Sequence, residues 1–252
     1  MSVNMDNMVK VFERPRSLTD VQFSYCPGCH HGLVTRIIAH TIDELDIQDR
    51  AVIVGPVGCS VSIYEWFRCD GIQAAHGRAS AVATGIKRVN PDLIVLAYQG
   101  DGDLAAIGTA ESIHAANRGE NITVIFINNQ IYGMTGGQMA PTTLVGQRAT
   151  SCPDGRNPQL TGYPIRFAEM IAQLDAPVYV TRQALYDQKR IVAASRAIRK
   201  AFRCQVEGKG YSLVEMLTNC TTNWRMSPIE TNNHLMNEVV KAFPLGDFVD
   251  KG

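Results

Sequence analysis

The chain has 252 residues, 45% of them hydrophobic, and its 24 basic side chains balance its 24 acidic ones. This length and composition allow a full hydrophobic core and indicate a single α/β domain over 1–252. With no net charge and no basic block, the sequence argues against a nucleic-acid partner. It has no apolar run long enough to cross a bilayer and no signal-peptide pattern, so we expect no membrane partner and a cytoplasmic location.

Short apolar runs alternate with segments of helical spacing along most of the chain. The expected strands cover 51–54, 92–98, 122–127, 177–180 and 212–217, and the expected helices cover 79–89, 105–118 and 184–203. Continuous apolar strands are typical of a parallel sheet that is buried on both faces. The alternation of strand and helix predicts a doubly wound, mostly parallel α/β sheet.

Three segments fall outside this alternation. Residues 133–164 are rich in glycine and proline, and we expect a long loop over the active site, because loops of this length are usually functional or disordered. Segments 1–20 and 243–252 are expected to be extensions that contact a partner.

The most informative motif is Gly-Asp-Gly-Asp at 100–103, which follows one expected strand, while asparagines 128–129 follow the next. In an open parallel sheet, ligands bind at the carboxyl ends of the strands, so Asp101 and Asn129 are expected to face one crevice. A carboxylate, an amide carbonyl and the backbone carbonyl of Ile131 are oxygen ligands suited to Mg²⁺, whose remaining ligands would be diphosphate oxygens.

Other features near these strand ends also favour a diphosphate. Gly100 and Gly102 let the backbone approach a phosphate without a Cβ in the way. A helix that begins near Ala79 offers free N–H groups, and His76 or Arg78 adds hydrogen-bonding or positive character beside them. Each feature alone also fits an ordinary capped turn, a loop histidine or a surface arginine. The acidic motif at 100–103 and the asparagine pair at 128–129 each follow a strand, in this order. Together they favour the magnesium and diphosphate interpretation.

Seven cysteines form the second signal. Disulfides are rare in a cytoplasmic chain, so the cysteine spacing is better tested for metal binding. Cys26 and Cys29 form a C-x-x-C pair, Cys59 and Cys220 each follow a strand, and four such thiolates can hold a 4Fe-4S cluster. The pair alone also fits a zinc half-site or a redox pair, and Cys220 alone fits a buried structural cysteine. Three further cysteines, Cys69, Cys152 and Cys204, match no metal-ligand spacing, and we interpret them as structural cysteines too.

These motifs together resemble the beta subunit of 2-oxoacid:ferredoxin oxidoreductases, in the order typical of that family. The motifs that carry the resemblance are 26–29, 57–60, 76–78, 100–103, 128–129, 132–138 and Cys220. They cover nearly all of the chain between the first and the last of these cysteines. The resemblance implies the fold of the diphosphate domain of thiamine-diphosphate enzymes.

The resemblance also implies that thiamine diphosphate, Mg²⁺ and a 4Fe-4S cluster are bound. The implied metal ligands are Asp101, Asn129 and Ile131 for Mg²⁺, and Cys26, Cys29, Cys59 and Cys220 for the cluster. The residues implied around thiamine diphosphate are Cys59, Ser60, His76, Gly77, Arg78, Ala79, Gly100, Gly102 and Asp103. His30 and His31 are left out, because thiolates already complete the cluster.

The implied activity is CoA-dependent oxidative decarboxylation of a 2-oxo acid to acyl-CoA and CO₂, with electrons passing through the cluster to ferredoxin. The cofactor carries this chemistry, so no side chain is assigned as catalytic. The chain carries only the diphosphate-binding half of such an enzyme. An obligate alpha subunit with the pyrimidine-binding half is therefore expected, with a gamma subunit and a ferredoxin-like delta subunit, or fused domains, implied by the resemblance.

The substrate is only weakly encoded. Segments 139–143 and 223–228 most resemble members that act on branched-chain 2-oxo acids such as 2-oxoisovalerate, or on 2-oxoglutarate. A dicarboxylate needs a cation for its distal carboxylate, and either Arg148 or a partner residue can supply it. Two alternatives from other classes stay open: a non-redox thiamine-diphosphate decarboxylase or synthase subunit, and a zinc-binding structural subunit.

Overall fold

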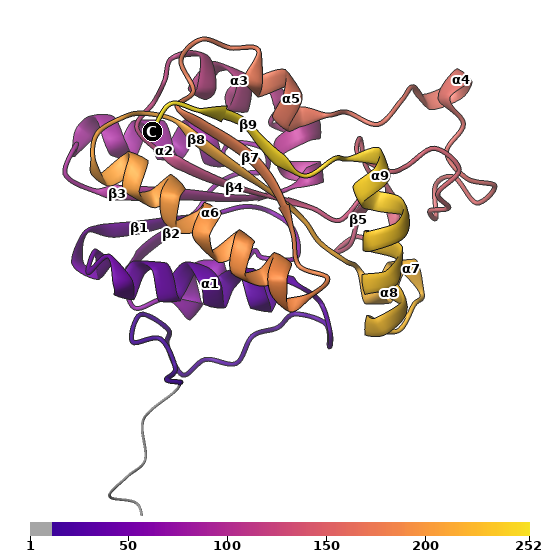
Figure 1. The fold of residues 1–252 in the computed structure, drawn as a ribbon, viewed down its shortest axis with the longest axis horizontal. Coiled ribbons are helices and arrows are strands. Elements are labelled where there is room, and N and C mark those ends of the chain that lie inside the picture. Colours follow the sequence, from indigo (N-terminus) through magenta and orange to yellow (C-terminus); the bar gives the residue numbers. More distant parts are fainter. Residues whose placement is uncertain (1–11) are drawn as a thin grey trace, which may run out of the picture.

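The computed structural model describes residues 12–252 and is organised around one seven-stranded sheet (Figure 1). Its strand order is β2-β1-β3-β4-β8-β7-β9, and every neighbouring pair is parallel except β7 and β9. The strands are β1 (Ala51–Gly55), β2 (Asp70–Gln73), β3 (Ile94–Gly100), β4 (Thr123–Asn128), β7 (Tyr179–Ala184), β8 (Ser212–Leu217) and β9 (Gly246–Asp250). A separate antiparallel ribbon pairs β5 (Ile131–Tyr132) with β6 (Gln138–Met139).

Helices cover both faces of the sheet. The α-helices are α1 (His31–Glu44), α2 (Ala79–Val89), α3 (Thr109–Asn117), α4 (Pro158–Thr161), α5 (Phe167–Ala172), α6 (Gln188–Val206), α7 (Thr221–Trp224), α8 (Pro228–His234) and α9 (Val240–Ala242). The apolar cluster on one face contains residues of α1 and α6, and the cluster on the other contains residues of α2, α3 and α5 (Figure 1). Shorter 3₁₀ and π turns are η2 (Gln48–Arg50), η3 (Ile63–Trp66), η4 (Asp103–Ile107) and η5 (Leu235–Val239). No helix of this described part is long and apolar enough to cross a membrane.

The central strands are buried along their length. Every residue of β1, β4 and β8 is buried, and β3 is partly exposed only at its last residue, Gly100. Because helices cover both faces, these mainly apolar strands have no solvent-facing side, and polar residues in them such as Glu215 of β8 are buried. The predicted doubly wound, mostly parallel α/β sheet is therefore confirmed.

Several details differ from the sequence-based expectations, and the helix expected over 184–203 begins only at Gln188, because β7 continues to Ala184. The expected helix over 105–118 is wrong as one element, because the π turn η4 precedes α3 and the N–H of Gly108 donates to the carbonyl of Asp103 at 2.9 Å. This bond spans five residues and widens the turn. Helix α1 was not predicted, although Val34, Ile38 and Ile42 recur there at helical spacing and are buried.

The two expected extensions are tied to the fold where they are described. Residues 246–250 of the C-terminal segment form β9, which pairs with the edge strand β7. Residues 1–11 of the N-terminal segment lie outside the described residues, while Leu18 forms a bridge with Phe67. Contact of either segment with a partner stays a prediction.

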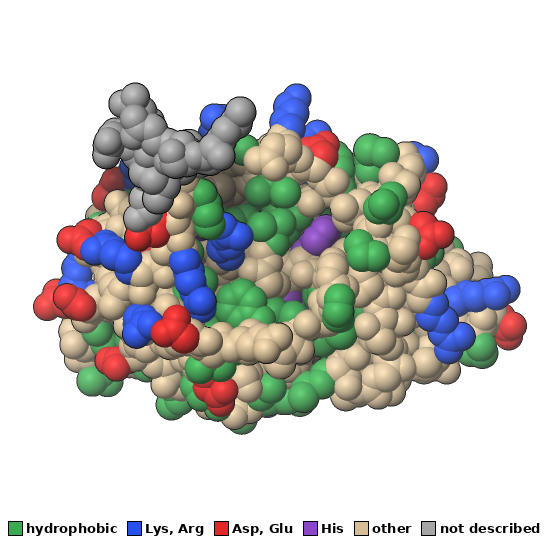
Figure 2. All heavy atoms as spheres, turned by 90° about the horizontal axis from the view of Figure 1, so that it is seen from below, with side chains coloured by type: hydrophobic (Ala, Val, Ile, Leu, Met, Phe, Trp, Pro, Cys, Tyr) green, Lys and Arg blue, Asp and Glu red, His purple; other side chains and the backbone are tan. Residues whose placement is uncertain are grey.

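The long segment 133–164 extends beyond the carboxyl end of the sheet, on the side where α7, α8 and α9 lie, and α4 projects away from the sheet (Figure 1). The buried guanidinium of Arg156 orders it by donating to the carbonyls of Pro141, Thr143 and Tyr163 at 2.7 to 2.9 Å. Seen from below, the surface of the molecule is hollowed near its centre, and apolar side chains lie around the hollow (Figure 2).

A buried arginine connects the sheet to the C-terminal segment. Arg182 of β7 is fully buried, its Nε lies 2.9 Å from Oε2 of Glu215, and it also pairs with Glu169. The same guanidinium donates to the carbonyl of Pro244 at 3.1 Å and lies 5.0 Å from the ring centre of Phe248.

We expect Arg182→Met to destabilise the protein by about 3 to 5 kcal/mol, because the fully buried Glu215 would lose its cation. Urea unfolding would measure the change. The matched control is Arg203→Met on the exposed face of α6, which should stay within about 0.5 kcal/mol of the wild type. A loss of less than about 1 kcal/mol for Arg182→Met would contradict the role given to the pair.

Candidate functional site

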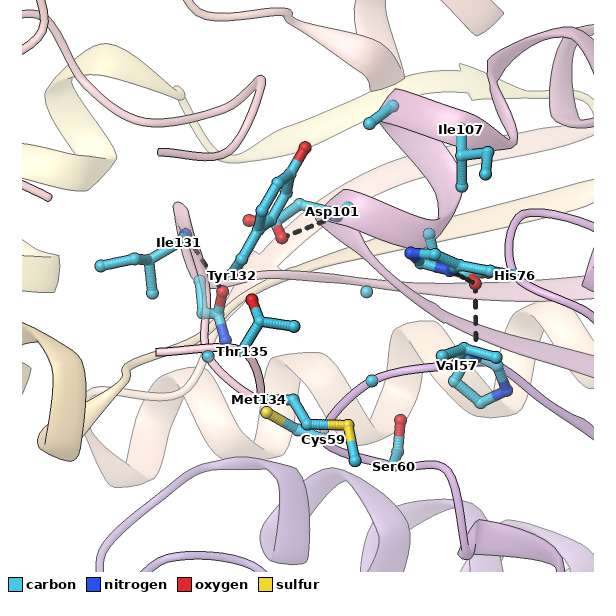
Figure 3. Close-up of a pocket in the computed structure, with 18 of the residues that line it drawn as sticks. Val57, Cys59, Ser60, His76, Asp101, Ile107, Ile131, Tyr132, Met134 and Thr135 are labelled. Atoms are coloured by element: carbon cyan, nitrogen blue, oxygen red, sulfur yellow. Dashed lines mark hydrogen bonds and ion pairs between the residues drawn. The ribbon is translucent and has the colours of Figure 1, made fainter. Parts of the chain in front are cut away.

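A cavity of about 310 Å³ lies at the carboxyl edge of the sheet, between the segments that follow β1, β3 and β4 (Figure 3). The predicted residues that line it are Cys59, Ser60, His76, Gly100, Asp101, Gly102, Asp103, Asn129 and Ile131. The predicted residues outside this lining are Gly77, Arg78, Ala79, Cys26, Cys29 and Cys220. Asp101 and Asn129, predicted from spacing, and several residues implied by the resemblance therefore line one cavity, and their contact with a cofactor stays a prediction.

Asp101 is a buried carboxylate at the end of β3. It accepts hydrogen bonds from the hydroxyl of Thr142 and from the N–H of Gly102, both at 2.8 Å. Burial raises the pKa of Asp101 to about 7, and these hydrogen bonds only partly oppose the shift. A cation beside the carboxylate would favour its charged form, which suits a Mg²⁺ ligand.

The turn after β4 has a left-handed backbone that other residues hold in place. Gln130 has φ +59°, its amide donates to the carbonyl of Asn128 at 2.6 Å, and Thr143 donates to its carbonyl at 2.6 Å. Within the turn, the N–H of Ile131 donates to the side-chain oxygen of Asn129 at 3.3 Å. The turn thus holds Asn129 and Ile131, two of the three predicted magnesium ligands, on the cavity wall.

The second acid of the motif, Asp103, acts differently from the first. Its Oδ1 accepts from Nδ1 of His76 at 2.6 Å and from the N–H groups of Gly77 at 2.9 Å and Val57 at 3.3 Å. Its Oδ2 accepts from the amide of Gln99 at 2.7 Å. Both oxygens are occupied by protein donors, so Asp103 joins the loops after β1 and before α2 and orients His76.

Arg78 and Ala79 lie at the start of α2. The guanidinium of Arg78 forms an ion pair with Glu111 at 2.9 Å and donates to the carbonyl of Ile107 at 3.2 Å, while Ala79 is buried. Neither residue lines the cavity, and cofactor contact by either stays a prediction. At Gly102, the group that lies close to the backbone is the side chain of Tyr132. A Cβ at this position would lie 2.7 Å from its ring.

The thiols of Cys59 and Cys220 lie next to each other. A Cβ added to Gly133 would be 2.9 Å from the sulfur of Cys59 and 3.7 Å from that of Cys220. Burial raises the pKa of Cys29 to about 11 and of Cys59 to about 12, and neighbouring cysteines add to both shifts. Within residues 12–252, no three or more acidic, histidine or cysteine side chains are placed to hold a metal ion as they stand. Buried thiols that oppose each other's ionisation are stabilised as thiolates by bound iron.

A buried aromatic group on the cavity wall was not predicted from the sequence. Nδ1 of His31 lies 2.8 Å from the hydroxyl of Tyr98, and the ring of Tyr25 stacks on the imidazole with centroids 4.9 Å apart. His31 is buried and lines the cavity, and burial lowers its pKa to about 4. Its position at the start of the unpredicted helix α1 was the signal that could have found it.

The fold and this geometry agree with a known class of enzymes. Residues 56–216 match the family described as thiamine pyrophosphate enzyme, C-terminal TPP binding domain. A solved 2-oxoglutarate:ferredoxin oxidoreductase from Magnetococcus marinus has the same fold, with a TM-score of 0.80 over 99% of this chain and 87% of that chain at 23% identity. The chain is therefore a thiamine-pyrophosphate-binding enzyme domain.

Relatives in sequence narrow this class. The ketoisovalerate oxidoreductase subunit VorA of Methanothermobacter thermautotrophicus is 50% identical over 98% of this chain and 52% of its own length. The 2-oxoglutarate synthase subunit KorB of Archaeoglobus fulgidus is 36% identical over 84% of this chain and 74% of its own. The chain belongs to the family of 2-oxoacid:ferredoxin oxidoreductase beta subunits, as its motifs predicted, and spans about half the length of VorA.

We expect Asp101→Asn to have opposite effects on the ligand-free and the ligand-bound protein. In the wild type, the penalty for burying this carboxylate grows as the pH rises from its ordinary pKa of 3.8 to the raised value of about 7. Removing the charge should therefore raise the melting temperature of the ligand-free chain at pH 8. It should also abolish the further rise that thiamine diphosphate and Mg²⁺ cause together.

Thermal unfolding at pH 8, with and without ligands, measures both effects. The matched control is Asp154→Asn, which removes an exposed carboxylate and should change neither value. The expectation fails if the Asp101 variant is still stabilised by the two ligands to the wild-type extent.

Proposed function

We propose that this chain is the thiamine-diphosphate-binding subunit of an enzyme that oxidatively decarboxylates a 2-oxo acid with coenzyme A and reduces ferredoxin through a 4Fe-4S cluster. The observation that carries the proposal is one cavity bordered by the buried carboxylate of Asp101, the turn at Asn129 and the thiol of Cys59. This arrangement would place a decarboxylating cofactor directly beside an electron acceptor. The names of the relatives, ketoisovalerate oxidoreductase subunit VorA and 2-oxoglutarate synthase subunit KorB, support the same activity.

In this proposal Asp101, Asn129 and the carbonyl of Ile131 hold Mg²⁺, which binds the diphosphate. When bound, thiamine diphosphate supplies the nucleophilic carbon and the electron sink for decarboxylation. The protein positions the cofactor, and apolar residues such as Ile107 and Met134 line the cavity beside it. The carboxylate of Asp103 contacts Nδ1 of His76 at 2.6 Å and so orients the imidazole on the cavity wall.

The four cysteines Cys26, Cys29, Cys59 and Cys220 are proposed as the cluster ligands. The support is that the sulfurs of Cys59 and Cys220 both lie close to Gly133, and that Cys26 and Cys220 contribute to the raised pKa of Cys29 and of Cys59. Cys69 and Cys204 contribute to neither observation.

The cavity wall favours a branched-chain substrate. Among the described residues that line it there is no lysine or arginine, and the side chains of Val57, Ala106, Ile107 and Met134 form an apolar portion. Arg148, the candidate partner for a distal carboxylate, lines a different cavity. We therefore place 2-oxoisovalerate before 2-oxoglutarate. A dicarboxylate would depend on a cation from the proposed alpha subunit, which would also supply the pyrimidine-binding half.

The test is anaerobic purification of the chain with its native partners, followed by iron and sulfide analysis and a panel of 2-oxo acids with coenzyme A and viologen. About four iron atoms per chain, after subtraction of any partner ferredoxin domain, and thiamine-dependent viologen reduction are expected. The 2-oxoisovalerate rate should exceed the 2-oxoglutarate rate. Zinc in place of iron would favour a structural subunit, and decarboxylation without viologen reduction would favour a non-redox enzyme.

Gly133→Ala tests the cluster site directly. The added methyl group would lie 2.9 Å from the sulfur of Cys59, inside normal contact distance, so we expect the iron content and the visible absorbance of the anaerobic protein to fall at least about twofold. The matched control is Gly85→Ala in α2, where a methyl group meets no atom within 4 Å. That variant should keep its iron and gain about 0.5 to 1 kcal/mol of stability. Equal iron in both variants would refute the site.

A further inference from the structure

The short helix α7 begins at Cys220, one of the proposed cluster ligands. Cys220 is the N-cap residue of α7, and its carbonyl accepts from the backbone N–H of Trp224 at 3.0 Å. The indole N–H of Trp224 donates to the carbonyl of Asn129 at 3.2 Å, which anchors α7 to the turn after β4. The side chains of this single helical turn are therefore held in a fixed position next to the sulfur of Cys220.

The side-chain amide of Asn223 connects Cys220 to the loop that lines the cavity. Its Nδ2 donates to the sulfur of Cys220 at 3.4 Å and to the carbonyl of Gly133 at 2.9 Å. Residues three apart in a helix lie on the same face, so residue 223 reaches back to residue 220. The amide nitrogen carries two hydrogens, enough for one bond to each acceptor. Because the carbonyl of Gly133 can only accept, the nitrogen and not the oxygen must face this side.

Two glycines let the loop backbone come close to this amide and to the sulfur. A Cβ added to Gly137, which has φ +84°, would lie 2.8 Å from Oδ1 of Asn223. A Cβ added to Gly133 would lie 3.7 Å from the sulfur of Cys220. The loop thus encloses the amide from the side opposite α7, and the bond from Asn223 to the sulfur is part of this contact.

The other asparagine beside Cys220 makes bonds of a different kind. The side chain of Asn219 donates to the carbonyl of Gly28 at 3.0 Å and accepts from the backbone N–H of His30 at 2.9 Å. These bonds tie the segment 26–29, with two of the proposed cluster ligands, to the segment that carries Cys220. Neither bond is to a sulfur, so Asn219 holds the two segments together, whereas Asn223 acts on a ligand atom.

A hydrogen bond to a ligand sulfur affects the reduction potential of an iron-sulfur cluster. When a 4Fe-4S cluster takes up one electron, its charge becomes more negative by one unit, and the sulfur ligands share that charge. An N–H group directed at a sulfur stabilises the reduced form more than the oxidised form, so it raises the potential. The effect is stronger in a partly buried site, where water screens the charge less.

We propose that Asn223 is a positioning residue that raises the reduction potential of the cluster through its hydrogen bond to Cys220. Its second bond, to Gly133, joins the cluster ligand to the loop on the cavity wall. The inference rests on the proposed function, because it requires a 4Fe-4S cluster on Cys220. It adds a role for a side chain that is neither a cluster ligand nor part of the cavity lining.

A redox titration of the complex, purified anaerobically with its native partners, measures this effect. Titanium(III) citrate would supply the electrons, and EPR spectroscopy would follow the reduced cluster. In Asn223→Leu, the ratio of reduced to oxidised cluster at a fixed potential should fall at least about threefold. This corresponds to a potential lower by about 28 mV, at 59 mV per tenfold change for one electron. Asn223→Asp, which turns a carboxylate oxygen toward the sulfur, should lower the potential further.

Two controls separate tuning of the cluster from a structural effect. Thr222 is the exposed neighbour of Asn223 in α7, so Thr222→Ala should keep the wild-type iron content and potential. Asn219→Ala removes bonds to the segment 26–29, so its iron content should fall, while the clusters that form keep the wild-type potential. Clusters on partner chains should titrate as before in every variant and serve as an internal reference.

An unchanged potential in both Asn223 variants, or an equal shift in Asn219→Ala, would overturn the proposal. Loss of the cluster from both Asn223 variants would overturn it as well, because Asn223 would then be needed for assembly of the cluster and not for its potential. Absence of iron from the wild-type complex would refute the proposed function itself, and this inference with it. The iron content of the wild type therefore distinguishes the two failures.

Discussion

The ion pair between Arg182 and Glu215 is the interaction on which the arrangement of the site depends. Glu215 lies in the central strand β8, and its other carboxylate oxygen accepts from the side chain of Asn128 at 2.7 Å. Asn128 in turn accepts from Gln130, the left-handed residue of the turn that carries the proposed magnesium ligands. A chain of buried polar contacts therefore runs from Arg182 of β7, next to the edge strand β9, to the cavity. Groups in such a chain lose their hydrogen bonds together, so its members are constrained to one arrangement.

Two carboxylates of one short motif illustrate how burial separates structural and ligand-binding roles. Both Asp101 and Asp103 are buried and accept hydrogen bonds on both oxygens, but Asp103 accepts from four protein donors, whereas Asp101 accepts from Gly102 and Thr142 and burial raises its pKa to about 7. A carboxylate whose hydrogen bonds are complete organises the surrounding loops. One that is under-compensated gains most from a metal ion. Asp103 is thus fitted to hold His76, and Asp101 is fitted to hold a cation.

Features that depend on strand order were predicted well from the sequence, and features that depend on side-chain packing were predicted poorly. Buried apolar runs located every central strand, and the rule that ligands bind at strand ends brought Asp101 and Asn129 to one cavity. The ion pair of Arg78 with Glu111, and the position of Arg148 in another cavity, depend on contacts between distant segments. Local spacing contains no information about such contacts. His31 was weighed only as a metal ligand and left out; its partner Tyr98 lies 67 residues away, so local spacing does not show that the two side chains meet.

The indole of Trp224 connects one cavity wall to the turn after β4. Its ring lines the cavity that Arg148 also lines, and its N–H donates to the backbone carbonyl of Asn129, a proposed magnesium ligand. A displacement of this ring would change its hydrogen bond to the turn, and a displacement of the turn would change the bond to the ring. Thermodynamic linkage requires such an effect to be equal in both directions. The cavity wall and the turn would then respond to each other through one shared hydrogen bond, without any rearrangement of the sheet.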